Sequence, residues 1–124
     1  HTEWKGDNTD IYIRRTFDFN EPNIAEDIYL IYSHDDVFEL YLNGEKLVST
    51  GLVWKNNVYL KLSEEAKKKL RKGKNVIAAH CHNTTGGSYV DFGLFREKEN
   101  AVKFANEAVQ KSVDVLAILS LVVL

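Results

Sequence analysis

Several residue types are scarce in this chain of 124 residues, and each scarcity excludes something. The single cysteine, Cys81, excludes an intrachain disulfide, so the cysteine content does not reveal the redox compartment. The formal net charge is only −2, so no strongly basic surface points to nucleic acid, and we expect no nucleic-acid partner. The chain has no methionine and starts at His1, so we expect it to be a piece of a longer or processed protein.

The chain does have enough apolar residues to build one core. Hydrophobic residues make up 44% of it and aromatic residues 11%, and its length is typical of one domain. We assign residues 1–95 to a single β-sandwich domain. Residues 96–124 have a different character, because residues 98–112 follow a helical rhythm of apolar positions. We expect a helix there.

The last twelve residues, 113–124, are almost wholly apolar. The run is too short to cross a bilayer as a helix, so we expect no membrane span. Its conformation stays open between helix and strand. An apolar run of this kind has to be covered, so we expect this tail to begin a following domain of the parent protein and to favour self-association of the chain.

Alternation of apolar and polar residues predicts the strands of residues 1–95. Strand-like runs cover residues 11–19, 28–33, 37–42, 46–48, 58–62, 75–82 and 88–95. The run at 28–33 is apolar on both faces, which predicts a central strand. Asn43-Gly44 predicts a tight hairpin, because a type I′ turn needs positive φ at both of its central residues. Ser63 before two glutamates predicts the start of a short helix. The pattern favours an all-β fold, an antiparallel jelly-roll sandwich with one short helix.

Two polar clusters are candidates for chemistry. His34-Asp35-Asp36 precedes the strand at 37–42 and could bind Ca²⁺ or orient a sugar hydroxyl. We favour a turn stabilised by Asp side chains, because Ca²⁺ needs six or more oxygen ligands. His80 and His82 share a strand face and could hold zinc with His34 or Asp91. We favour a hydrogen-bonded pair at a sheet edge, and we predict no metal site and no cofactor.

The remaining candidates are a cysteine and two tryptophans. Strand alternation turns Cys81 toward the core, which argues against a nucleophile. Trp4 and Trp54 lie in loop-like segments, where an indole ring either stacks on a sugar or plugs the end of the sandwich. If a sugar binds, we expect Trp54, Asn56, Asp35 and Asp36 to form its site, and we predict no catalytic residues.

Three stretches together carry a resemblance to a known family: Asp10–Phe17, His34–Gly44 and Gly73–Gly87. They resemble the galactose-binding-like domains attached to bacterial glycoside hydrolases, including the sugar-binding domain of β-galactosidase-like enzymes. They are most similar to the accessory β-sandwich of bacterial glutaminase A-like proteins, where Ala108–Ala117 resembles the start of the next domain. After Ala117 the sequence departs from that pattern.

The resemblance implies a galactose-binding-like sandwich in a secreted or periplasmic bacterial protein. It implies a non-catalytic accessory module of a larger hydrolase, of the glutaminase or glycoside hydrolase type. The implied partners are the catalytic domain of the parent chain and carbohydrate. Two alternatives stay open: a purely structural spacer between domains, and a small metal-dependent hydrolase that uses His34, His80 and His82.

Overall fold

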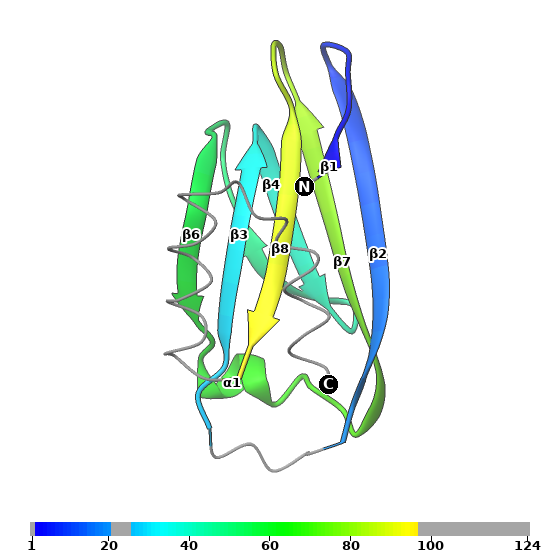
Figure 1. Ribbon diagram of the computed structural model, residues 1–124, viewed down its shortest axis with the longest axis vertical. Coiled ribbons are helices and arrows are strands. Elements are labelled where there is room, and N and C mark those ends of the chain that lie inside the picture. Colours follow the sequence, from blue (N-terminus) through cyan, green and yellow to red (C-terminus); the bar gives the residue numbers. More distant parts are fainter. Residues whose placement is uncertain (1, 21–25, 97–124) are drawn as a thin grey trace.

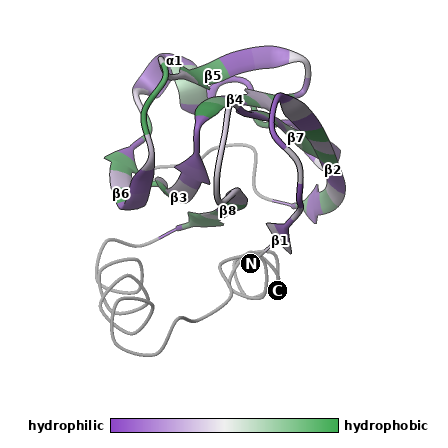
Figure 2. Ribbon diagram, turned by 90° about the horizontal axis from the view of Figure 1, so that it is seen from above, coloured by the Kyte–Doolittle hydropathy of each residue, from purple (hydrophilic) through white to green (hydrophobic). Residues whose placement is uncertain are grey.

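The computed structural model describes residues 2–20 and 26–96, which form two antiparallel β-sheets packed face to face (Figure 1). In chain order the elements are β1 (Thr2–Glu3), β2 (Thr9–Phe19), β3 (Tyr29–Asp35), β4 (Val37–Leu42), β5 (Glu45–Ser49), β6 (Lys55–Lys61), α1 (Glu64–Lys67), β7 (Gly73–Asn83) and β8 (Tyr89–Phe95). Sheet A has the strand order β1-β8-β3-β6, and sheet B has the order β2-β7-β4-β5. Seen from above, the two sheets form two layers (Figure 2).

This strand order is that of a jelly roll, because the chain passes between the two sheets from β2 to β3 and again from β3 to β4. The predicted all-β sandwich is therefore confirmed. All seven predicted strand-like runs correspond to β2–β8. The two-residue β1, which pairs with β8 at Thr2 and Glu3, was not predicted, because two residues are too few to show alternation.

The core lies between the sheets and follows the alternation in the sequence. In β4, the side chains of Phe38, Leu40 and Leu42 are fully buried and face inward. In β3, residues of both faces are buried, and the strand lies between β8 and β6, which confirms its predicted central position. Cys81 is also fully buried and belongs to the core cluster.

The lower end of the sandwich in Figure 1 comprises the β4–β5 turn, α1 and the start of β7. Asn43 and Gly44 both have positive φ, 51° and 85°, as the predicted hairpin requires. The Ser63 hydroxyl accepts a hydrogen bond from the Ala66 amide and caps α1. Both local predictions are confirmed.

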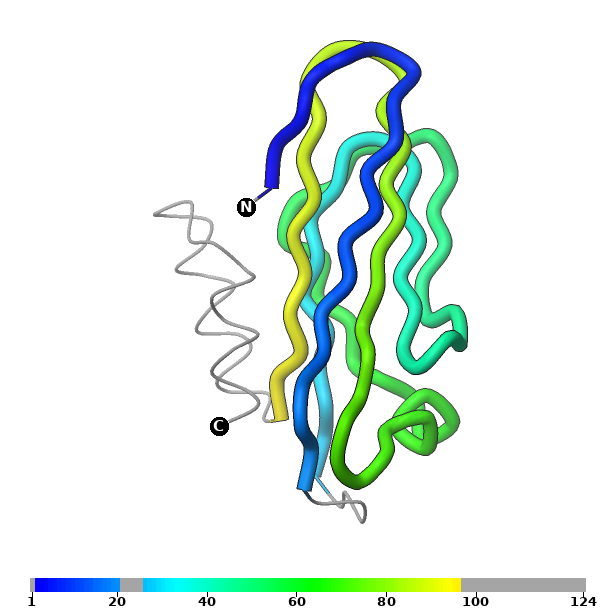
Figure 3. Tube along the Cα trace, turned by 90° about the vertical axis from the view of Figure 1, so that its right-hand side faces the viewer, coloured from blue at the N-terminus to red at the C-terminus, as the bar shows by residue number. Residues whose placement is uncertain are grey.

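The upper end is built from the β3–β4 junction, the β1–β2 and β7–β8 loops, and the start of β6. Figure 3 shows the β1–β2 loop (blue) beside the β7–β8 loop at this end. The Asn8 amide donates to the Thr84 carbonyl at 2.9 Å and joins the two loops. The upper end therefore gathers segments from four parts of the chain.

The predicted helix at 98–112 and the apolar tail at 113–124 lie outside the described residues, as does nearly all of the assigned second region, 96–124. Within the part that the structure describes, no helix is long and apolar enough to cross a membrane.

Candidate functional site

The carboxylates of Asp35 and Asp36 lie at the upper end, where β3 of sheet A passes into β4 of sheet B. Asp35 is the last residue of β3 and pairs with Tyr89 of β8. Asp36 lies between the strands, and its amide donates to the His82 carbonyl at 3.1 Å. Both residues are partly exposed. The junction between the sheets therefore presents two adjacent carboxyl groups to solvent from firmly paired strand ends.

The side chain of Asp36 bonds to a nearby backbone amide, as predicted for an Asp side chain in a turn. Its Oδ2 accepts a hydrogen bond from the Thr84 amide at 2.8 Å. Burial acts to raise the pKa of Asp36, but hydrogen bonds from Thr84, Asp35 and Thr85 outweigh it and leave the pKa below its usual value. Asp36 is therefore the charged member of the pair.

Asp35 behaves in the opposite way. Burial raises its pKa to about 6, and the hydrogen bond and charge of Asp36 act in the same direction. Two neighbouring carboxyl groups that share a proton behave in this manner, because ionising both would place like charges side by side. Below about pH 6 the pair can therefore both accept and donate hydrogen bonds, which suits the hydroxyl groups of a sugar.

Trp54 lies at the same end and is 63% exposed. It immediately precedes β6, whose first residue, Lys55, pairs with His34 in β3. The Tyr89 hydroxyl donates to the Lys55 carbonyl at 3.4 Å, and Tyr89 also pairs with Asp35. Tyr89 therefore connects Asp35 to Lys55, the residue after Trp54. Trp54 and the carboxyl pair therefore lie next to the paired ends of β6 and β3, at the upper end of the sandwich.

Asn56, the fourth predicted residue, is exposed in β6. It lies one residue further from the end than Lys55. We call Asp35, Asp36, Trp54 and Asn56 the end site. Sequence reasoning did not include Tyr89, whose position beside Asp35 depends on the pairing of β8 with β3.

Trp4 has a different environment from Trp54. It is partly buried and packs against the core, and its indole N–H donates to the Thr9 hydroxyl at 3.1 Å. The Ser88 hydroxyl donates to the Trp4 carbonyl at 2.5 Å. Trp4 therefore fits the alternative in which an indole plugs the end of the sandwich, and Trp54 fits the alternative in which the ring is exposed.

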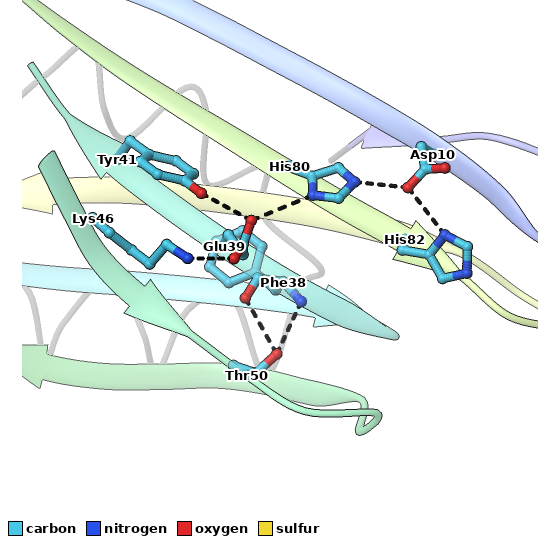
Figure 4. Close-up of polar contacts among 8 residues, drawn as sticks. All are labelled: Asp10, Phe38, Glu39, Tyr41, Lys46, Thr50, His80 and His82. Carbon is cyan, nitrogen blue, oxygen red and sulfur yellow. Dashed lines mark hydrogen bonds and ion pairs between the residues drawn. The ribbon is translucent and has the colours of Figure 1, made fainter. Parts of the chain in front are cut away.

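The two histidines of β7 form a second polar cluster, on the outer face of sheet B (Figure 4). Asp10 Oδ1 lies 2.7 Å from His80 Nε2 and 3.0 Å from His82 Nδ1. Hydrogen bonds from His80 and His82 hold the pKa of Asp10 below its usual value. The expected hydrogen-bonded pair is present, but its expected place at a sheet edge is wrong, because β7 lies between β2 and β4.

Glu39 of β4 extends this cluster on the other side of His80. Its Oε2 lies 3.5 Å from His80 Nδ1 and accepts a hydrogen bond from the Tyr41 hydroxyl at 2.9 Å. Its Oε1 accepts one from Lys46 Nζ at 2.6 Å. Hydrogen bonds from Lys46 and Tyr41 lower the pKa of Glu39. We call Asp10, Glu39, His80 and His82 the histidine face.

The structure does not bring His34 to the histidine face. His34 is fully buried between the sheets, with its ring stacked on Phe38 at 5.0 Å between ring centroids. Its Nδ1 lies 2.7 Å from the Asp36 carbonyl, and burial lowers its pKa. His80 and His82 point outward from the other sheet, so the suggested set of His34, His80 and His82 is wrong as a single metal site. Among the described residues, no group of three or more potential ligands is arranged to hold a metal ion.

Cys81 lies between the two histidines in sequence but on the opposite face of β7. Its thiol donates to the Asp35 carbonyl at 3.5 Å, and burial raises its pKa to about 11. A thiol with this pKa is protonated at neutral pH and is a weak nucleophile. The predicted inward orientation of Cys81 is confirmed.

No protein-family model matches the sequence, and no curated protein matches it. A solved structure that is similar to this chain is the PA14 domain of an antifreeze protein, with a TM-score of 0.47 and 19% sequence identity over 75% of this chain. This chain spans 47% of the length of that protein chain. The resemblance to glutaminase A-like accessory domains stays a prediction.

Proposed function

We propose that this chain is a non-catalytic, carbohydrate-binding accessory module of a larger secreted bacterial hydrolase, and that the end site binds the sugar. The observation that carries the proposal is that the exposed ring of Trp54 lies at the same end of the sandwich as the carboxyl pair of Asp35 and Asp36. An indole face packs against the apolar face of a pyranose, and carboxyl groups bind its hydroxyls. The parent hydrolase, of the glutaminase or glycoside hydrolase type, and the secreted location rest on the sequence resemblance.

The end site has the mixed chemistry that sugar recognition uses. The Thr84 amide and a hydrogen bond with Asp35 hold Asp36, so the polar groups are fixed before a ligand arrives. A fixed site loses less conformational entropy on binding than a mobile one. A non-catalytic role agrees with a buried, protonated Cys81 and with histidines that are already engaged with carboxylates.

Calorimetry on the full chain tests this proposal. We expect heat of binding with galactose or with galactose-containing oligosaccharides at millimolar concentration. We expect Trp54→Ala to weaken binding about fivefold or more, since one aromatic stacking contact contributes on the order of 1 kcal/mol. Leu52→Ala is the matched control, because Leu52 is 67% exposed in the same segment. No heat with any of these sugars, together with no binding on a glycan array, would count against the proposal.

One observation favours the structural spacer as a second candidate. Leu52, Val53 and Trp54 are consecutive apolar residues with exposed fractions of 67%, 39% and 63%. An exposed apolar run can be the surface on which another domain docks. A spacer predicts no response to sugar, and it predicts that Leu52→Ala and Trp54→Ala weaken docking to the neighbouring domain by similar amounts.

A further inference from the structure

The outer face of sheet B carries a hollow of about 490 Å³, which is separate from the end site. This volume lies within the roughly 300–1,000 Å³ range of small-molecule sites. Side chains of Tyr12, Arg14, Glu39, Tyr41, Ala78 and His80 line it. They come from β2, β4 and β7, which lie side by side in the middle of the sheet and at its β2 edge.

The strand register explains why a hollow forms here. Ala78 of β7 pairs with Arg14 on one side and with Tyr41 on the other. Two residues further along β7, and on the same face, His80 pairs with Tyr12 and with Glu39. The small side chain of Ala78 therefore stands among five large ones, which line the hollow with it.

Tyr12 provides an aromatic platform at the rim of the hollow. Its side chain is 76% exposed, yet its ring stacks on His80 with centroids 4.6 Å apart and an angle of 9° between the rings. His80 is itself fixed by Asp10 at 2.7 Å (Figure 4). The ring is thus oriented before binding, while its outer face stays accessible to a ligand.

The hollow also contains the guanidinium of Arg14, which has no carboxylate partner among the described residues. Lys46 is paired with Glu39, and the two histidines are paired with Asp10. The exposed Arg14, by contrast, makes no hydrogen bond or ion pair within the part of the chain that the structure describes. A guanidinium binds a carboxylate through two parallel hydrogen bonds. The one uncommitted charge in the hollow is therefore suited to a single carboxylate.

We propose that this hollow binds an acidic sugar, a uronic acid residue, with the pyranose ring on Tyr12 and the carboxylate on Arg14. Glu39 and the Tyr41 hydroxyl lie on the far side of the Ala78 floor and bind sugar hydroxyls. The ligand is a monoanion rather than a phosphate, because the carboxylates of Glu39 and Asp10 repel a more highly charged group from a site with one free guanidinium. This inference does not depend on the end site, so either can fail alone.

Titration calorimetry on the full chain carrying Trp54→Ala, which weakens sugar binding at the end site, compares trigalacturonate with its neutral counterpart, galactotriose, and tests the inference. We expect trigalacturonate to bind at least about tenfold more tightly at low salt, and we expect added salt to reduce this preference. Arg14→Gln should abolish the preference, and Tyr12→Ala should weaken the binding of both sugars. Ala78→Phe, which fills the floor, should also abolish binding at this face.

Three controls make the result specific. Arg71→Gln removes the same charge from an exposed arginine that follows α1, and it should leave trigalacturonate binding unchanged. Trp54→Ala should also leave it unchanged, which separates this site from the end site. Arg14→Lys should retain part of the preference and shows that the site is still folded.

Two results would overturn the inference. One is equal affinity for the acidic and the neutral trisaccharide, including no binding of either. The other is tighter binding of adenosine monophosphate than of trigalacturonate, because a nucleotide can also place a ring on Tyr12 and an anion on Arg14.

Discussion

The two ends of the sandwich both concentrate Asn, Asp and Gly, and both bury one such side chain in hydrogen bonds, Asn75 at the lower end and Asn83 at the upper. Only the upper end also leaves a pair of carboxyl groups partly exposed. At the lower end, the buried side chain of Asn75 accepts from the Arg71 amide at 2.8 Å and donates to the Arg71 and Gly73 carbonyls at 2.7 and 2.9 Å. At the upper end, Asp35 and Asp36 stay partly exposed, and Asp35 shares a proton instead of gaining a cation. One end is closed within itself, and the other is open to a ligand.

The lower end shows what a structural polar cluster looks like. Asn43 Nδ2 donates to Asn75 Oδ1 at 2.8 Å and to the Lys69 carbonyl at 2.7 Å. Asn43 Oδ1 accepts from the Val76 amide at 2.9 Å. These bonds tie the β4–β5 turn to the loop before β7, and they use the hydrogen-bonding groups of both amides. A buried cluster whose groups are satisfied stabilises the fold and leaves nothing with which to bind a ligand.

The two ends differ in the polar groups that a ligand can reach. Conspicuous residues at both ends are equally visible in the sequence, but only the upper end combines partial exposure, a raised pKa and an exposed aromatic ring. Polar groups that the fold does not need for itself are the better candidates for binding.

The largest effect on stability is expected from breaking the lower cluster with Asn75→Ala. The substitution leaves the Arg71 amide, two carbonyls and part of the Asn43 side chain without partners, and unsatisfied buried groups cost on the order of 1–3 kcal/mol. We expect a loss of about 3 kcal/mol in the free energy of unfolding, measured by urea denaturation. Asn56→Ala is the matched control on an exposed strand position, and it should change stability by less than about 0.5 kcal/mol.

A loss of less than about 1 kcal/mol for Asn75→Ala would contradict the view that the lower end is closed and structural. It would mean that water replaces the missing amide at little cost, and the contrast with the upper end would then disappear.

The fold was predictable because its signals are local. Alternation along each strand, as at Phe38, Leu40 and Leu42, marks the core, and Asn43-Gly44 marks the tight turn without any knowledge of distant residues. The place of β7 was not predictable, because the order of strands in a sheet depends on pairing between distant segments. His80 and His82 were therefore expected at an edge and lie inside sheet B.

The sites depend on the same distant pairings. All four end-site residues were expected together because carboxylates, an amide and an indole suit a sugar, and the β3–β6 pairing places Trp54 and Asn56 at the same end as Asp35 and Asp36. The hollow was not foreseen, since Tyr12, Glu39 and His80 come from three strands that only the register brings into one row. The nearest signal in the sequence is the polar face of residues 10–14, which reads as an ordinary solvated strand.

An intermediate effect is expected from Asp35, through the pH dependence of stability. Its pKa is raised from 3.8 to about 6 on folding, so the folded state binds the proton more tightly than the unfolded state. The stability from this group is full below pH 4 and is lost as the pH rises through about 6. One pKa unit corresponds to about 1.4 kcal/mol, and since the proton is shared with Asp36 on a partly exposed pair, we expect a loss of about 1–2 kcal/mol.

The measurement is urea denaturation of the wild type and of Asp35→Asn between pH 4.5 and pH 7.5. The variant cannot ionise at this position, so its stability should fall less over this interval than that of the wild type. The lowered pKa values of Asp10, Asp36 and Glu39 act in a different window, because the stability that they contribute is lost only as the pH falls below about 4. Parallel curves for the two proteins would show that the carboxyl pair does not share a proton.

The smallest effect on stability is expected at Trp54, and this is what the comparison of the two ends requires. A ring that is 63% exposed and belongs to a binding surface contributes little to the fold, so Trp54→Ala should change the free energy of unfolding by less than about 0.5 kcal/mol. Trp4→Ala is the comparison, because Trp4 packs against the core and donates to Thr9; it should cost more than about 1 kcal/mol. Thermal and urea denaturation of both variants measure the difference. If Trp54→Ala were as destabilising as Trp4→Ala, both rings would be plugs of the upper end, and the end site would lose its aromatic platform.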